Sequence, residues 1–135
     1  MKVNFVVNND LHRIECIIKV KDKEFTGYAL CHPNDNDYYN ERTGKTIAEA
    51  RAMIKYQQYL KAEERTKLHA LYEVRHRFRL TNRLSHEYVI ITKFIHEHEE
   101  RLSEIIDAIQ ENRDFLYSYI NEKDKLYKRL REIKK

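Results

Sequence analysis

A chain of 135 residues is the length of one domain, and 41% hydrophobic with 36% charged residues is a globular composition. Two glycines and one proline leave little material for loops, which favours long helices over a sandwich or a barrel. The chain starts without the apolar run of a signal peptide, and no stretch approaches a membrane span. We therefore expect a cytoplasmic protein with no membrane partner.

The positive charge is concentrated in the middle third of the chain. The formal net charge is +4, but residues 1–40 carry five basic and six acidic side chains, and residues 84–135 carry ten and eleven. Residues 41–83 carry eleven basic and five acidic side chains. This asymmetry predicts a localised anion-binding site rather than a generally basic surface.

Residues 1–31 have the pattern of a β-meander. Ile14, Cys16 and Ile18 alternate with other side chains, which is the period of a strand with one buried face. Apolar runs before and after this segment predict two more strands, with turns at "NND" and "KDK". Gly27, within the third strand, indicates a bulge or the close approach of another backbone.

Two cysteines are too few for a disulfide framework. Cys16 and Cys31 are therefore expected to be free thiols of a cytoplasmic protein. A disulfide between two strands of the meander is the alternative.

Residues 32–45 are expected to form a connecting loop, since they hold the only proline. Asp35 and Asp37 alternate as in a calcium loop, but the glutamate that closes such a loop is missing, because its position holds Thr46. Turn chemistry explains the aspartates and asparagines of this segment without a metal.

The "TGKT" of residues 43–46 resembles the end of a phosphate-binding loop. That motif needs a glycine at position 39, which holds Tyr39. The match to that motif therefore fails. A weaker interpretation places Gly44, Lys45 and Thr46 at a helix N-terminus, where backbone amides that point outward favour an anion. An ordinary capped helix start is the alternative.

The first helix is predicted over residues 46–80. Thr46 followed by Glu49 matches a capping box, and Ile47 opens an apolar stripe at helical spacing. The middle of this stripe, residues 61–67, is polar. The segment "LTNRLS" provides the break before the next helix.

The second helix, residues 84–133, carries the clearest pattern in the chain. Apolar residues recur with alternating spacings of four and three, which is the heptad of a left-handed coiled-coil seam. Three of the fifteen seam positions are polar. The seam consists of Leu84, Tyr88, Ile91, Ile95, His98, Leu102, Ile105, Ile109, Asn112, Leu116, Tyr119, Lys123, Leu126, Leu130 and Ile133.

These elements predict an α+β single domain. An N-terminal three-stranded antiparallel sheet is followed by two long antiparallel helices with a coiled-coil seam. The first helix is shorter and polar in its middle, so we expect it to leave part of the seam for another subunit, in a dimer or hexamer. A buried Asn112 would pair with its copy and determine the register.

The spacing of the histidines and carboxylates does not match any metal-binding or catalytic motif considered. His96 and His98 are two residues apart, so a helix directs them to different faces. Glu73 and His76 have the Glu-x-x-His spacing of di-iron bundles, but that signature must appear twice. With so few glycines and no nucleophile, base and acid at a recognisable spacing, we expect neither an enzyme nor a metal or other cofactor.

The segment "RHRFRLTNR", residues 75–83, is the strongest candidate for function. It has four arginines in nine residues, and like charges one helical turn apart destabilise a helix unless an anion or carboxylates compensate. An arginine fork binds phosphate through two parallel hydrogen bonds, and a phenylalanine can stack on a base. Cations near a helix C-terminus are the alternative interpretation. The predicted ligand residues are Arg75, Phe78, Arg79, Asn82 and Arg83, with Arg42, Lys45 and Arg51 as a second anion contact.

One part of the sequence matches a pattern that reads roughly Cys-His-Pro-x-Asp, followed by Gly-x-x-Ile-Ala-x-x-Arg-Ala. With a sheet followed by two long helices, the chain resembles the first Thoeris anti-defence (Tad) family, found in phages of Gram-positive bacteria. The residues that carry the resemblance are Cys31, His32, Pro33, Asp35, Gly44, Ile47, Ala48, Arg51 and Ala52.

This resemblance implies a non-catalytic sponge in the cytoplasm of the infected host. Members of the family sequester cyclic ADP-ribose isomers, some also hold cyclic trinucleotides, and they assemble as dimers and hexamers. We therefore expect a phage anti-defence protein that captures a cyclic nucleotide immune signal. The alternative is a nucleic-acid-binding or protein-blocking coiled-coil phage factor.

Overall fold

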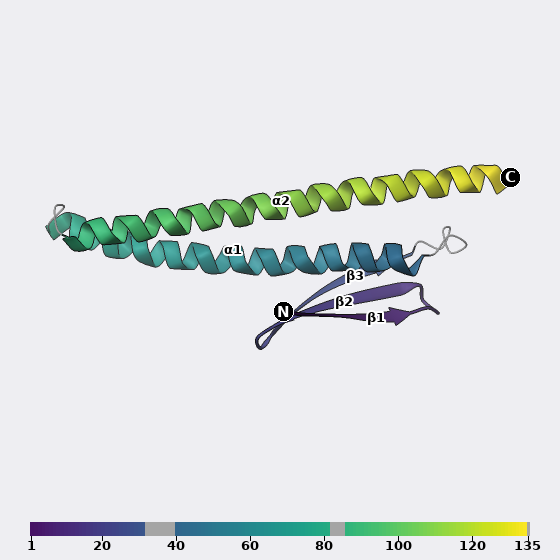
Figure 1. Ribbon diagram of the computed structural model, residues 1–135, viewed down its shortest axis with the longest axis horizontal. Helices are drawn as coiled ribbons and strands as arrows, with labels where there is room; N and C mark the ends of the chain where they lie inside the picture. The colour runs from purple at the N-terminus through teal and green to yellow at the C-terminus, as the bar shows by residue number, and fades with distance from the viewer. Residues whose placement is uncertain (32–39, 82–85, 135) are drawn as a thin grey trace. The chain divides into compact units, whose positions relative to one another are not determined.

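The computed structural model describes residues 1–31, 40–81 and 86–134. Three strands, β1 (Lys2–Asn8), β2 (Arg13–Val20) and β3 (Lys23–Leu30), are followed by two long helices, α1 (Glu41–Thr81) and α2 (His86–Lys134) (Figure 1). This architecture confirms the predicted α+β fold of a three-stranded antiparallel sheet followed by two long helices. Within the described ranges, no helix has both the length and the apolar character that a membrane span requires.

The strands form an antiparallel meander in the order β1-β2-β3. Cys16, in the centre of β2, pairs with Phe5 of β1 and Gly27 of β3. The alternation in β2 is what the sequence predicts, since Ile14, Cys16 and Ile18 are all fully buried. Pairing through Gly27 is regular on both sides, so this glycine does not mark a bulge.

Both turns of the meander use a non-glycine residue with a left-handed backbone. His12 precedes β2 with a φ of 48°, and Lys21 follows β2 with a φ of 57°. Such conformations cost roughly 1–2 kcal/mol per L-residue. In the first turn, a side-chain bond from the Leu11 N–H to Asn8 Oδ1 (3.1 Å) supports the conformation.

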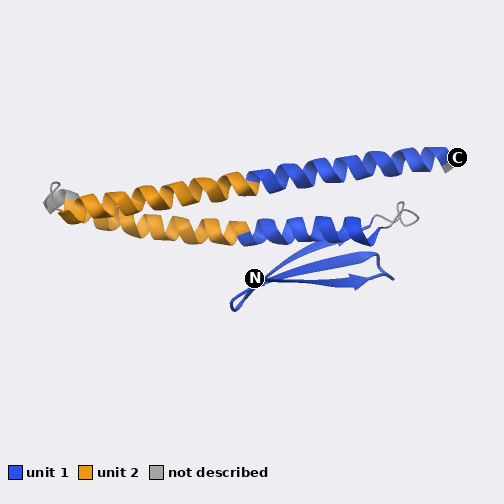
Figure 2. Cartoon of the chain, in the orientation of Figure 1, with its two compact units in different colours: residues 1–56, 110–135 blue, residues 57–109 orange. Residues whose placement is uncertain are grey.

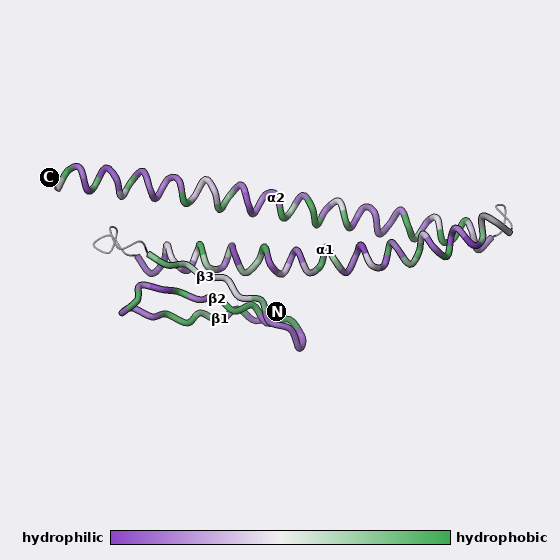
Figure 3. The backbone as a smooth tube through the Cα atoms, turned by 180° about the vertical axis from the view of Figure 1, so that it is seen from behind, coloured by the Kyte–Doolittle hydropathy of each residue, from purple (hydrophilic) through white to green (hydrophobic). Residues whose placement is uncertain are grey.

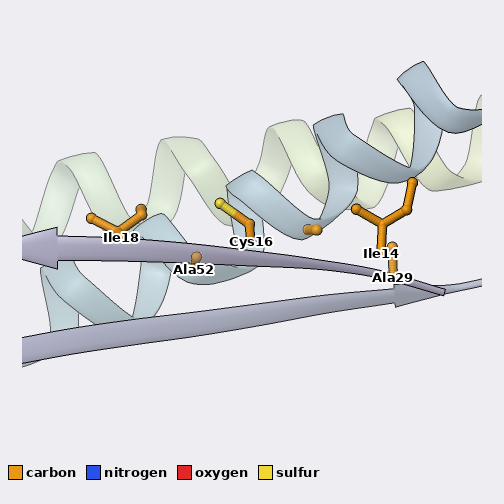
Figure 4. Packing of buried hydrophobic residues seen from close by; sticks show 6 residues of the cluster. Ile14, Cys16, Ile18, Ala29 and Ala52 are labelled. Carbon is orange, nitrogen blue, oxygen red and sulfur yellow. The ribbon is translucent and has the colours of Figure 1, made fainter. Parts of the chain in front are cut away.

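The first turns of α1 cover the inner face of the sheet (Figure 4). Ala48 and Ala52, four residues apart on α1, are fully buried against β2 and β3. A Cβ added to Gly27 would collide with the backbone of both alanines and lie 2.9 Å from the Cβ of Arg51. Gly27 therefore serves the close backbone approach that its position in the strand predicts.

The helix begins earlier than the sequence indicates, at Glu41 instead of residue 46. Asn40 is the cap, because its Oδ1 accepts the backbone N–H groups of Arg42 (2.9 Å) and Thr43 (3.4 Å). Thr46 is not a cap, since its hydroxyl donates to the carbonyl of Arg42 one turn back, at 2.9 Å. The predicted loop at residues 32–45 is therefore wrong for its last five residues.

The backbone N–H of Gly44 does not point outward, as an anion site at this helix start would require. Gly44 lies inside the first turn, and its N–H donates to the Asn40 carbonyl at 3.0 Å. A glycine inside a helix lowers its stability by about 1 kcal/mol relative to alanine, so the sequence predicts that Gly44 lies outside the helix. The structure nevertheless has Gly44 inside α1. A residue without a Cβ fits best there, because a Cβ would lie 2.5 Å from Cδ1 of Ile14.

The chain forms two compact units (Figure 2). Unit 1 comprises residues 1–56 and 110–135, and unit 2 comprises residues 57–109. Both helices run through both units, and the single-domain organisation stays a prediction. Unit 1 contains the sheet core, and unit 2 is a pair of helical segments.

Unit 2 combines apolar packing with one polar pair. Leu68 and Ile95 are buried, and one turn away from each along its helix Glu64 of α1 accepts a 2.7 Å hydrogen bond from Nδ1 of His98 on α2. The side chain of Glu64 is only 9% exposed. His98 was predicted as a polar seam residue, and the polar stretch in the middle of α1 supplies its partner.

The hydropathy of α2 alternates along its length (Figure 3). The described seam positions are buried or half-buried as far as Lys123, and Asn112 has an interaction within its own chain. Beyond Lys123 the inward face shifts in part: Leu130 of the seam is still half-buried, but Tyr127 is half-buried while Leu126 is 43% exposed. A straight helix drifts about 20° per heptad relative to a 3.5-residue repeat, which accounts for this shift.

Candidate functional site

A cavity of about 170 Å³ lies within unit 1. It is bounded by the end of β3 with the turn before β2, by the first turns of α1, and by the C-terminal part of α2. Its wall combines apolar and ionisable side chains, the mixture typical of ligand sites. The lining residues are His12, Ala29, Leu30, Cys31, Asn40, Thr43, Gly44, Ile47, Arg51, Ile120, Lys123, Asp124 and Tyr127.

The α1 wall follows from helical spacing. Thr43, Ile47 and Arg51 are each four residues apart and so lie on one side of the helix. Thr43 is 8% exposed. Arg51 is anchored to the sheet, because its Nη1 donates a 2.7 Å hydrogen bond to the backbone carbonyl of Tyr28. A guanidinium has five N–H donors, so this bond leaves further donors for a ligand.

The α2 wall uses the same spacing rule. Ile120, Lys123 and Tyr127 are three and four residues apart and all line the cavity. The ammonium of Lys123 also lies 5.4 Å from the centre of the ring of Tyr119, a cation–π distance to a residue that is not among those lining the cavity. Asp124 adds one carboxylate to the same wall.

The sheet contributes the third wall. The N–H of Cys31 donates to the carbonyl of His12 at 3.0 Å, which joins the chain after β3 to the turn before β2. Both cysteines are free thiols, and Cys31 is half-buried in this wall. Cys16 lies in the core instead, where burial, aided by the negative charge of Glu49, raises its pKa from 9.0 to about 11.

The cavity is suited to a small anionic group. Arg51 and Lys123 bring two positive charges from two different helices, and Thr43 adds a hydroxyl. Ile47 and Ile120, both half-buried, supply apolar wall beside these groups, and Leu30 adds an exposed apolar rim. Ligand pockets usually measure about 300–1,000 Å³. The cavity therefore fits a phosphate or one ring of a nucleotide, with the rest of the molecule outside it.

Of the predicted corner residues, only Arg51 lines the cavity. Lys45 instead forms a 3.2 Å ion pair with Glu41 and lies 5.4 Å from the centre of the Phe5 ring. Arg42 is exposed at the start of α1. Arg42, Lys45 and Arg51 therefore all belong to unit 1, but they do not form one common anion site.

The other predicted ligand residues belong to unit 2. Arg75 lies 5.6 Å from the centre of the Tyr72 ring. Burial raises the pKa of Tyr72, the charge of Glu99 and a hydrogen bond with it raise that pKa further, and Arg75 lowers it. Phe78, half-buried, follows one turn after Arg75. Asn82, Arg83 and the side chain of Arg79 lie outside the described part of the chain, so this arginine cluster stays a prediction.

The sequence reasoning missed most of the cavity wall. Lys123 carried a signal, since a lysine interrupts an otherwise apolar seam at that position. Tyr127 carried none, because a strict heptad places Leu126 on the inner face. His12 and Thr43 are in segments expected to be a turn and a loop, where a side chain's direction follows from tertiary packing alone.

Comparison with known protein families, with curated proteins and with solved structures found no match for this chain. Across residues 1–31, 40–81 and 86–134, no group of three or more His, Cys, Asp or Glu side chains is arranged to hold a metal ion.

Proposed function

We propose that the protein is a non-catalytic binding protein that captures a small phosphate-bearing nucleotide, with one phosphate in the cavity of unit 1. The observation that carries this proposal is the position of Arg51 and Lys123, which come from two helices to line one small cavity. Arginine and lysine are the side chains that bind phosphate, one by a planar fork and the other as a point charge.

The class of nucleotide comes from the resemblance to the Tad family. It makes a cyclic ADP-ribose isomer the first ligand to test and a cyclic trinucleotide the second. In this proposal the protein acts in the cytoplasm of an infected bacterium, as a homo-oligomer that sequesters an immune signal. The arginine-rich segment of unit 2, with Arg75 and Phe78, stays a separate candidate for binding an anionic ligand.

Calorimetric titration with matched lysine variants tests the cavity. Lys123→Gln should weaken binding of the cyclic nucleotide by about tenfold, the effect of losing one charged hydrogen bond of about 1.5 kcal/mol. Lys125→Gln, two residues along α2 at an exposed position, is the control and should leave affinity unchanged. Equal affinity for both variants would place the ligand elsewhere.

The fate of the ligand tests the absence of catalysis. After incubation and heat denaturation, chromatography should recover the cyclic nucleotide intact and in the amount bound. Recovery of a hydrolysed product would contradict a sponge and indicate an enzyme.

Salt dependence separates this proposal from nucleic-acid binding by the same basic residues. A protein that contacts several phosphates of a duplex loses affinity steeply with ionic strength, whereas a cavity holding one phosphate loses little. Binding of duplex DNA with a steep salt slope, together with no response to any cyclic nucleotide, would favour the nucleic-acid factor.

A further inference from the structure

The C-terminal part of α2 has a second apolar stripe on its outer side. Phe115, Leu126 and Ile133 are 49%, 43% and 79% exposed. Tyr119 belongs to the same stripe, since its ring stacks on that of Phe115 with centroids 5.6 Å apart. Large apolar side chains that gather on one face of a helix indicate an interface.

This stripe is distinct from the face that lines the cavity. Successive residues of a helix are about 100° apart, so Leu126 and Tyr127 point in clearly different directions. Tyr127 is half-buried in the cavity wall, whereas Leu126 is exposed. The partner of the outer stripe therefore lies outside the described part of this chain's unit 1.

Two charged residues complete a regular repeat along the stripe. Glu122 and Arg129 are both exposed, and together with the apolar members they give spacings of four, three, four, three and four. That is the heptad spacing of a helix that packs against another helix. The stripe reads Phe115, Tyr119, Glu122, Leu126, Arg129 and Ile133.

The charges select one orientation for a second copy of the same helix. In a parallel pair each residue faces its own copy, so Glu122 would face Glu122 and Arg129 would face Arg129, which is repulsive. In an antiparallel pair related by a two-fold axis near residue 124, Glu122 lies within one turn of Arg129 of the second copy. A self-complementary patch of this kind is what a two-fold dimer requires.

We propose that the outer stripe of α2 binds the same stripe of a second copy, antiparallel, with the two-fold axis near residue 124. Phe115 then packs against Ile133 of the second copy, and Tyr119 packs against Arg129. Glu122 of each copy pairs with Arg129 of the other, once on each side of the two-fold axis. The inference rests on the proposed homo-oligomer and deepens it, and the interface includes three positions of the predicted seam, Tyr119, Leu126 and Ile133.

Disulfide trapping in the full-length chain tests the orientation. Cys31→Ser serves as the background, because the remaining thiol, Cys16, is fully buried. Phe115→Cys with Ile133→Cys should form a covalent dimer under mild oxidation. Within one chain these positions are about 27 Å apart on the helix, so they cannot bridge each other.

The single variants and a shifted pair are the controls. Phe115→Cys alone should form no covalent dimer under oxidation, because its copy also lies about 27 Å away in the antiparallel arrangement. Tyr117→Cys with Ile133→Cys should cross-link far less, since Tyr117 is exposed but off the stripe. Efficient cross-linking of Phe115→Cys alone would show a parallel pair and overturn the proposal, as would equal yields in all variants.

Charge exchange tests the pairing without cysteines. Sedimentation should show that Glu122→Arg weakens self-association by about tenfold, because a two-fold interface contains each pair twice. Arg129→Glu should do the same, and the double variant should restore association. A double variant that associates no better than either single one overturns the proposal, and so does a monomeric wild-type protein.

The nucleotide experiments remain separable from this test. Cyclic nucleotide binding measured on Glu122→Arg as a monomer reports on the cavity alone. Loss of association with retained binding separates the two functions, whereas a wild-type dimer that binds no nucleotide leaves the interface intact and contradicts the proposed function.

Discussion

Single residues decide how closely α1 approaches the sheet, and the two glycines differ in what surrounds them. Gly27→Ala should destabilise the protein by about 1–3 kcal/mol, because the new Cβ meets backbone atoms of Ala48 and Ala52 that cannot rotate away. Gly44→Ala meets only the end of the Ile14 side chain and gains helix propensity, so its effect should stay within about 1 kcal/mol. Urea unfolding followed by circular dichroism distinguishes the two, and equal losses would contradict the close approach at Gly27.

The thiol of Cys16 makes stability depend on alkaline pH. Burial raises its pKa from 9.0 to about 11, so the folded state keeps a proton that the unfolded state releases between these values. The contribution of Cys16 is therefore fully present below pH 9.0 and declines as the pH rises toward about 11. Urea unfolding across this range should show a steeper decline for the wild type than for Cys16→Val, a substitution of similar volume. Parallel declines would show that other groups account for the loss.

At the scale of elements, the pair between Glu64 and His98 connects the helices of unit 2. His98→Leu should destabilise the protein by about 1–3 kcal/mol, because the carboxylate of Glu64 stays buried without its 2.7 Å partner. Lys67, 4.0 Å from the other carboxylate oxygen, compensates only in part. Glu64→Leu combined with His98→Leu should recover most of the loss, since apolar replacements often match a buried polar pair. Additive losses in a double-mutant cycle would show that the two side chains do not interact.

The C-terminal part of α2 is needed for unit 1. A chain that ends after Asn112 loses the α2 wall of the cavity and several half-buried apolar side chains, including Leu116 and Ile120. Burial of each large side chain contributes about 1.5–3 kcal/mol, so the sum approaches the stability of a typical domain. The truncated chain should unfold at a much lower temperature. Removal of residues 133–135 alone should change little at concentrations where the chain is monomeric, because Ile133 is 79% exposed within one chain. Unchanged melting of the chain ending at Asn112 would contradict a structural role for this segment.

At the scale of the whole molecule, two compact units share two continuous helices. An unbroken helix transmits the loss of one part to the next, so we expect one cooperative unfolding transition. Ile14→Ala in unit 1 and Ile95→Ala in unit 2, both at fully buried positions, should each lower the single melting temperature seen by circular dichroism. A second transition in either variant would show that the units unfold independently.

Local patterns in the sequence were enough to determine the elements. The alternation through Ile14, Cys16 and Ile18 depends only on the two-residue period of a strand, and the four-three repeat of α2 depends only on the pitch of a helix. The order of sheet and helices follows from these patterns, whereas for Gly27 they left a bulge and a close backbone approach as alternatives. The seam pattern also predicted that His98 faces inward. It did not identify Glu64 as the hydrogen-bond partner of His98.

Only the tertiary structure decided where α1 starts and which side chains share a cavity. Gly44 breaks helices in isolation but lies inside α1, because Ile14 of the sheet occupies the space of a Cβ. His12, Arg51 and Lys123 are far apart in the chain and line one cavity because three elements pack together. Propensity and periodicity describe neighbours along one element, whereas the site is formed by contacts between elements, which no local pattern contains.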